Sequence, residues 1–207
     1  MKSDELREWV QTIAAETMVN SVALLEDLQN SLRLASNVEI GNAAKNLAGH
    51  AIGIYGCYLV QQRLISSIED KDLFKQLLRD AYLDYVVSTW MSIKDEEQKT
   101  AKKEIGAMFD ADTLLYSQTI GGVGLTFKEK LRGIFNTYSP IKFIDNTFSN
   151  RFKLKTARFL GAGNTKFIEE HGNDFYMQME VLDKIVAAIT QSFLELDVKT
   201  PGFSLRV

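Results

Sequence analysis

Apolar residues recur every three to five positions along most of this chain, which is the spacing of an amphipathic helix. The first run extends from Leu6 to Leu32 and follows Ser3, a suitable N-cap residue, with Asp4 and Glu5 in the first turn. The pattern predicts one helix of about nine turns, or two helices with a break near Asn20.

A second helix is expected from about Ile40 to Ser67. Its residues 46–62, "NLAGHAIGIYGCYLVQQ", carry no charge. Seventeen such residues are at the short limit for a membrane span, and the three glycines, the histidine and the two tyrosines dilute their hydropathy. The segment therefore predicts a buried central helix, and we expect no stable membrane insertion.

Three glycines, Gly49, Gly53 and Gly56, fall on one face of this second helix. Each glycine costs up to about 1 kcal/mol relative to alanine inside a helix. A stripe of them is best explained by the close approach of another backbone, either within the fold or across a homo-oligomer.

The remaining helices are predicted from the same periodicity, with few breakers between them, since only Pro140 and Pro201 occur. We expect an all-α fold, an irregular multi-helix bundle of six to eight helices around the glycine-striped helix. Residues 1–207 should form a single domain, with a possible seam at 119–126, "TIGGVGLT", that separates a core from a C-terminal subdomain. The further expected helices are Ser67–Ile93, a charged helix that ends near Phe109, a short helix over "DADTLLYSQT", Phe127–Tyr138, and a last helix from Asn173 to about Asp197.

Composition narrows the class of protein. Of 207 residues, 45% are hydrophobic and 25% charged, which is typical of a globular chain rather than a disordered one. The single cysteine, Cys57, excludes an intramolecular disulfide and a multi-cysteine zinc site. The polar start of the chain does not resemble a secretory signal, so a reducing, cytoplasmic setting is expected. His50 and Cys57 have no carboxylate in their segment and are expected in the core.

Charge is distributed unevenly. Residues 128–166 contain nine Lys or Arg and two acidic residues, a sum of +7, whereas the net charge of −3 leaves −10 for the rest. This asymmetry predicts a non-enzymatic binding or adaptor protein whose basic segment contacts an anionic partner, either nucleic acid or an acidic protein surface. The alternative is a solvated face that balances the acidic remainder. The candidate contacts are Lys142, Arg151, Lys153, Lys155, Arg158 and Lys166.

The basic stretch itself is ambiguous in structure. A helix would place Arg151, Lys155 and Arg158 on one face, whereas a strand would alternate basic and apolar residues in "RFKLK"; its helical surroundings favour the helix. The following "GAGNTK" could offer backbone N–H groups to a phosphate, but it lacks the G-x-x-x-x-G-K-[ST] pattern of a P-loop. A helix end followed by a turn is the simpler interpretation.

A metal-dependent all-α hydrolase acting on a nucleotide or phosphoester is the competing hypothesis. Asp80 and Asp84 are four residues apart, and like charges at that spacing destabilise a helix unless a cation lies between them. Glu180 and Asp183 could supply two more oxygen ligands for Mg²⁺ or Mn²⁺. Their E-x-x-D spacing is similar to the second half of the metal motif of all-α NTP pyrophosphohydrolases, and the first half is absent here.

Overall fold

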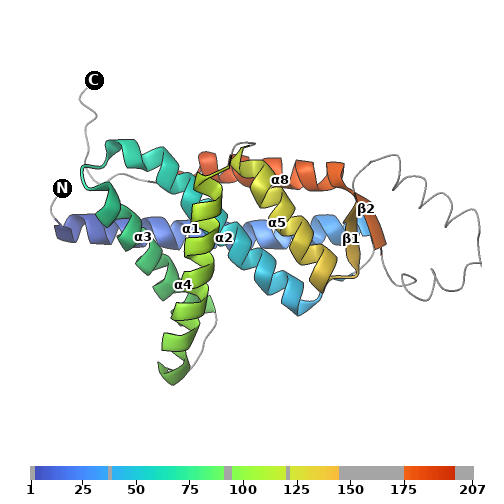
Figure 1. The fold of residues 1–207 in the computed structure, drawn as a ribbon, viewed down its shortest axis with the longest axis horizontal. Coiled ribbons are helices and arrows are strands. Elements are labelled where there is room, and N and C mark those ends of the chain that lie inside the picture. Colours follow the sequence, from blue (N-terminus) through green and yellow to red (C-terminus); the bar gives the residue numbers. More distant parts are fainter. Residues whose placement is uncertain (1–2, 37–38, 91–94, 120–121, 145–174, 199–207) are drawn as a thin grey trace, which may run out of the picture.

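The computed structural model describes residues 3–36, 39–90, 95–119, 122–144 and 175–198. Within them the chain forms six α-helices and one pair of short strands, so the all-α multi-helix prediction is confirmed (Figure 1). The helices are α1 Ser3–Ser36, α2 Asn42–Leu64, α3 Lys71–Tyr85, α4 Asp95–Ser117, α5 Val123–Tyr138 and α8 Met179–Leu194, with a 3-10 turn η1 Ile65–Ser67, a π-helical turn η2 Val86–Trp90, and the strands β1 Ile141–Ile144 and β2 Phe175–Gln178.

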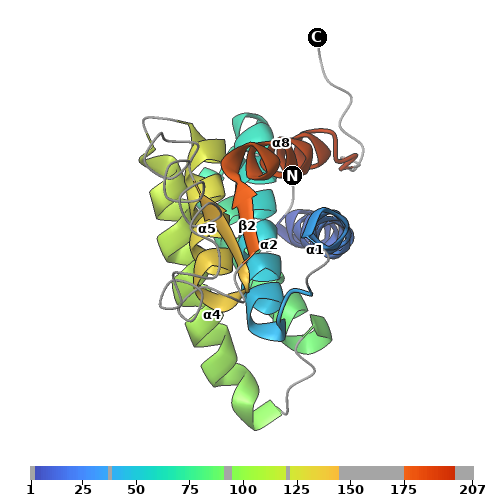
Figure 2. The same cartoon turned by 90° about the vertical axis from the view of Figure 1, so that its right-hand side faces the viewer.

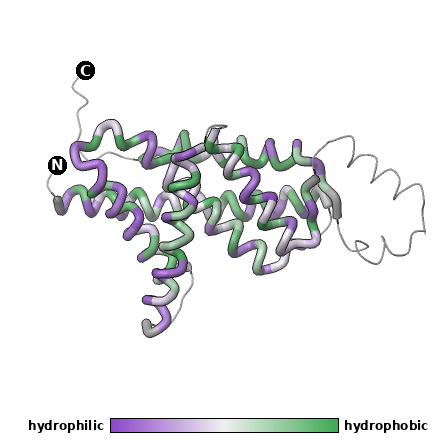
Figure 3. The backbone as a smooth tube through the Cα atoms, in the orientation of Figure 1, coloured by the Kyte–Doolittle hydropathy of each residue, from purple (hydrophilic) through white to green (hydrophobic). Residues whose placement is uncertain are grey.

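Helix α2 lies at the centre of the bundle, as the uncharged run 46–62 predicts. It packs against α1, α3, α4, α5 and α8, and thirteen of its 23 residues are buried. Around it, α1 and α8 run along the long axis of the molecule, and the first turns of α4 extend beyond the bundle (Figures 1 and 2). Hydrophobic and hydrophilic residues alternate along the surrounding helices, which leaves each with one face for the core (Figure 3).

The glycine stripe of α2 makes room for aromatic side chains of the same chain. A Cβ atom on Gly56 would lie 2.3 Å from the Phe193 ring, and one on Gly53 would lie 2.9 Å from the Tyr82 hydroxyl. The expected neighbour was a backbone, so that prediction is corrected: glycine is needed here because a ring fills the space of the missing side chain. Gly49 is buried in the same helix. A homo-oligomer through these glycines is therefore not supported.

Helix α1 is continuous through Asn20, so the one-helix alternative is confirmed. The Asn20 amide donates to the Ser192 hydroxyl and its oxygen accepts from it, both at 3.1 Å, which ties the middle of α1 to α8. Nearer its start, Trp9 stacks on Phe74 of α3 with ring centroids 6.0 Å apart. These contacts explain why a helix of 34 residues lies flat on the bundle.

Several helix boundaries differ from the prediction. The helix expected over Ser67–Ile93 is the shorter α3, Lys71–Tyr85, followed by the π-helical turn Val86–Trp90. The residues around Phe109 and Asp110 continue one helix, α4, where two had been expected. Helix α5 begins at Val123, four residues before the expected start, because Gly122 takes a φ of 94° that completes the turn. Across this loop the Thr119 and Thr126 hydroxyls lie 2.8 Å apart. The seam at 119–126 stays a prediction.

The strands were not predicted. β1 and β2 pair in parallel, from Ile141 opposite Phe175 to Ile144 opposite Gln178, at the opposite end of the molecule from the start of α1 (Figure 1). The last helix consequently begins at Met179 rather than Asn173. Phe143 and Met177 are buried, and the pairing fixes the position of both residues that flank 145–174.

Candidate functional site

The cations at the start of the basic segment are paired within the fold. Lys128 of α5 lies 2.7 Å from the Asp183 carboxylate of α8, and Lys130 pairs with Asp112 of α4. Arg132 lies 2.9 Å from Glu129, one turn away on the same helix. Lys128 and Lys130 therefore join α5 to α8 and to α4. The alternative in which basic residues dock onto the acidic remainder applies to these two lysines.

Lys142 is the candidate contact that the structure describes. Its ammonium donates to the carbonyl oxygens of Asn136, at 2.8 Å, and Ser139, at 2.9 Å, at the C-terminal end of α5. A cation there satisfies exposed carbonyls and complements the helix dipole. Lys142 thus has a structural role. The other candidates, Arg151, Lys153, Lys155, Arg158 and Lys166, lie outside the described residues, as do the helix predicted over them and "GAGNTK".

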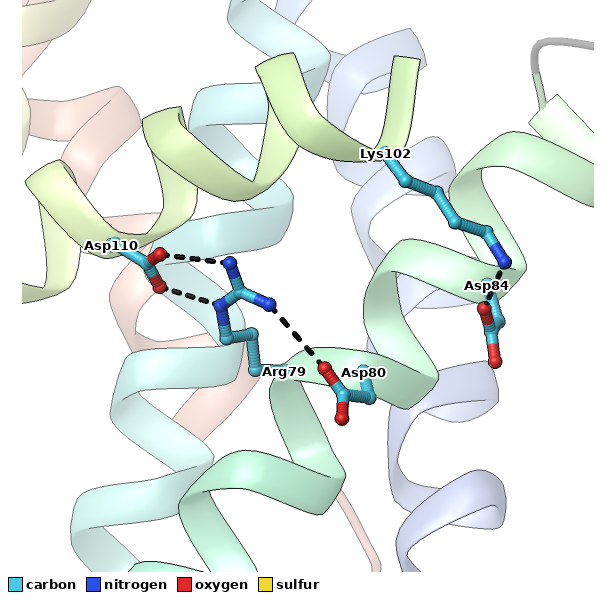
Figure 4. Close-up of polar contacts among 5 residues, drawn as sticks. All are labelled: Arg79, Asp80, Asp84, Lys102 and Asp110. Atoms are coloured by element: carbon cyan, nitrogen blue, oxygen red, sulfur yellow. Dashed lines mark hydrogen bonds and ion pairs between the residues drawn. The ribbon is translucent and has the colours of Figure 1, made fainter. Parts of the chain in front are cut away.

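The carboxylates proposed as metal ligands are not brought together. Asp80 lies 3.3 Å from the Arg79 guanidinium, and Asp84 lies 2.5 Å from the Lys102 ammonium (Figure 4). Asp183 pairs with Lys128. Among the residues that the structure describes, no group of three or more His, Cys, Asp or Glu could hold a metal ion. The structure therefore does not assemble Asp80, Asp84, Glu180 and Asp183 into one site.

Arg79 joins α3 to α4 at the surface. Its Nε and Nη2 atoms donate to the two oxygens of Asp110, at 2.6 and 2.8 Å, in a bidentate pair (Figure 4). This hydrogen bonding raises the pKa of Arg79. Gly106 on α4 makes the approach possible, because a Cβ atom there would lie 2.7 Å from Nη2. The guanidinium is thus fixed along one wall of a groove.

This groove, of about 560 Å³, lies between α2, α3 and α4. Its walls carry neutral hydrogen-bonding side chains, among them Gln61 and Tyr58 of α2, which are only 8% and 7% exposed. Sequence reasoning missed it. The available signal was a glutamine at position 61, three residues after Tyr58 in the uncharged and mostly buried run 46–62.

A second polar cluster lies inside the bundle. Asp112 is 8% exposed and pairs with Lys130, so two charges meet where α4 packs on α5. Burial and then the charge of Asp112 raise the pKa of Tyr116, whose hydroxyl has no hydrogen-bond partner in the described part of the chain. Burial and then the charge of Lys130 lower the pKa of His50. At neutral pH the histidine is therefore uncharged and the tyrosine protonated.

Cys57 is buried and free, as expected of a core thiol. Burial raises its pKa, which disfavours the thiolate and hence nucleophilic or metal-binding chemistry at this position.

Comparisons of the chain with protein-family models, with curated proteins and with solved structures give no match. In the described ranges, no helix combines the length and the apolar character that crossing a bilayer requires. Function is therefore inferred from the residues of this chain alone.

Proposed function

We propose that the chain is a non-enzymatic binding protein whose residues 151–166 contact an anionic partner, either nucleic acid or an acidic protein surface. One observation supports this proposal most strongly. Between Asp145 and Glu169 the sequence has five Lys or Arg and no carboxylate, whereas Lys128 and Lys130 have carboxylate partners in the fold.

The proposal narrows the predicted contacts to Arg151, Lys153, Lys155, Arg158 and Lys166. Lys142 contributes less, since two of its three ammonium donors serve the end of α5. Lys and Arg that neutralise phosphates release condensed counterions, so binding of nucleic acid should weaken steeply with salt.

The strand pair supports a binding role for the segment that it flanks. Ile144 lies opposite Gln178 and Ile141 lies opposite Phe175, so the parallel pairing fixes Ile144 and Phe175, the two residues that flank 145–174, at opposite ends of one strand pair. A segment fixed at both ends has fewer conformations to lose on binding than a free tail of the same length.

A titration with labelled single- and double-stranded DNA and RNA, and with poly-glutamate, at two salt concentrations tests the proposal. Lys155→Glu with Arg158→Glu should abolish salt-sensitive binding, because it reverses two of the five charges. The matched control is Lys99→Glu with Lys103→Glu, the same reversal at two exposed positions of α4, which should still bind.

Two outcomes of that titration separate the partners and the proposal. Binding to poly-glutamate and to none of the nucleic acids would identify an acidic protein surface as the partner. Full binding by the Lys155→Glu, Arg158→Glu variant would reject residues 151–166 as the contact.

A further inference from the structure

Helix α4 buries few apolar side chains for its length. In a helix of 23 residues, those buried against the bundle are Ala101, Ile105, Phe109 and Tyr116. By comparison, α3 buries four residues in 15, and α8 buries five in 16. The part of α4 before Ala101 projects from the bundle (Figures 1 and 2). Hydrophobic burial therefore holds α4 less firmly, per residue, than it holds α3 or α8.

Two polar groups interrupt the buried stripe of α4. Asp112 is 8% exposed and pairs with Lys130 of α5, so docking of α4 removes both charges from water. The Tyr116 hydroxyl is buried and has no hydrogen-bond partner in the described part of the chain. Water would solvate all three groups again if α4 left the bundle, which offsets part of the interactions lost.

The polar contacts between α4 and α3 are ion pairs at the surface (Figure 4). Asp110 pairs with Arg79, and Lys102 pairs with Asp84. The side chains of Asp110 and Asp84 are 57% and 67% exposed. Ion pairs this exposed contribute little to stability and contribute less as salt increases. The attachment of α4 to α3 should therefore weaken in high salt.

The described chain on either side of α4 departs from α-helical geometry. The π-helical turn Val86–Trp90 precedes α4, and Gly122, with a φ of 94°, follows it. A few residues at the ends of elements are enough to absorb the backbone rotation of a hinge. Helix α4 can therefore move without requiring α3 or α5 to unfold.

We propose that α4 is a salt-sensitive cover over α2 and α3, which opens as one unit while the other described helices stay folded. Its Tyr116 ring packs on Tyr58 of α2, and its Phe109 ring on Tyr82 of α3, with centroids 5.4 and 5.3 Å apart. Opening would expose both tyrosines of the bundle. No residue of 151–166 takes part, so this proposal can fail without the proposed function failing.

Hydrogen exchange of the full chain, followed by mass spectrometry at low and high salt, tests the proposal. Amides from Ala101 to Ser117 should exchange at one common rate, about tenfold faster than those of α2. This rate should rise with salt relative to that of α2. Removal of both α3–α4 ion pairs, by Asp84→Asn with Asp110→Asn, should raise it about fivefold.

Two further variants serve as controls for the exchange of α4. Asp72→Asn removes an exposed ion pair within α3, that with Lys75, and should leave the exchange of α4 unchanged. Asn20→Ala removes the hydrogen bonds between α1 and α8. It should speed exchange in α2, which requires global unfolding, without changing exchange in α4, because opening of α4 leaves α1 and α8 in contact.

Four results would overturn the proposal. Equal exchange rates in α4 and α2 would show that α4 opens only when the whole chain unfolds, and faster exchange of α4 in Asn20→Ala would show the same. A rate that falls gradually from Ala101 to Ser117 would indicate fraying from the projecting end. Exchange of α4 that does not respond to salt would show that the ion pairs with α3 do not control the opening.

Discussion

Asp110 and Asp112 stand two residues apart on α4, and each joins the helix to a different neighbour. Asp110 binds Arg79 of α3 at the surface, with 57% of its side chain exposed. Asp112 binds Lys130 of α5 with 11% of its side chain exposed. Water screens the first pair and stabilises either partner when the other is removed, whereas the second pair has been largely desolvated. One aspartate therefore forms a solvent-screened contact between α4 and α3, and the other forms a largely desolvated contact between α4 and α5.

The surroundings of the two pairs differ as well. Burial raises the pKa of Tyr116 and of Tyr82, and the charge of Asp112 adds to both shifts. Burial also lowers the pKa of His50, and the charge of Lys130 adds to that shift. Asp110 lines the open groove. A change at the buried pair should thus affect several titrating groups, and a change at the surface pair should affect the α3–α4 contact alone.

The largest effect is expected for Lys130→Ala, which leaves the Asp112 carboxylate buried without its partner. Loss of one member of a buried pair costs about 3 kcal/mol of unfolding free energy. Urea denaturation of the variant and the wild type measures the difference. Equal stability would show that the Asp112–Lys130 pair is solvated like the surface pair.

Removing both charges of the Asp112–Lys130 pair should reverse the sign of the change in unfolding free energy. Asp112→Leu combined with Lys130→Met replaces the pair by apolar side chains, which is neutral or stabilising by about 1 kcal/mol in comparable buried pairs. The same urea experiment checks this expectation, with the two single variants completing a double-mutant cycle. A double variant less stable than Lys130→Ala would contradict it.

A smaller effect is expected for Arg79→Ala at the surface pair. Exposed ion pairs contribute about 0.5 kcal/mol, and the bidentate geometry places this one at the upper end of the range. The loss should shrink further in high salt, since counterions screen exposed charges. Thermal unfolding at low and high salt measures both the loss of stability and its salt dependence. A loss that does not change with salt and exceeds the loss in Lys130→Ala would contradict the expected order of the two pairs.

The smallest effect concerns pH. The pKa of His50 is lowered in the folded protein, so the unfolded chain takes up a proton first as the pH falls through about 6.5. The contribution of His50 to the free energy of unfolding is therefore complete above that pH. It is lost as the pH falls from there to the lowered pKa of His50 in the folded protein. His50→Gln should flatten the stability profile between about pH 7.5 and 5. Lys130→Met should flatten it in part, and Arg79→Ala should leave it unchanged.

Much of the fold could be predicted because a helix leaves its apolar spacing within one continuous stretch of sequence. The apolar spacing from Leu6 to Leu32 and the uncharged run 46–62 correspond to α1 and α2. In the last helix the apolar residues that recur every three or four positions, from Met179 to Phe193, are buried. The strands could not be found this way. Each has four residues, too few for a period, and their pairing joins Ile141 to Phe175, far apart in sequence.

The sites were harder to predict than the helices. The net charge of residues 128–166 suggested that they form one basic surface. Lys128 and Lys130, however, pair with carboxylates of α8 and α4 that lie near them only in the folded chain. A pattern at Asp112 was available: it lies in step with Ile105, Phe109 and Tyr116, on the buried stripe of α4. A carboxylate at such a position requires a cation buried beside it. It therefore indicates a polar site more strongly than the total charge of a segment does.

The most direct test of the account is the salt dependence of nucleic-acid binding, with Arg151, Lys153, Lys155, Arg158 and Lys166 all changed to Gln in a comparison variant. If the five cations contact phosphates, the logarithm of the association constant for a single strand should fall with the logarithm of salt with a slope of about −3.5. The variant should lose this slope together with its binding. A slope that persists in the variant, or no binding of the wild type to DNA, RNA or poly-glutamate, would contradict the proposed function.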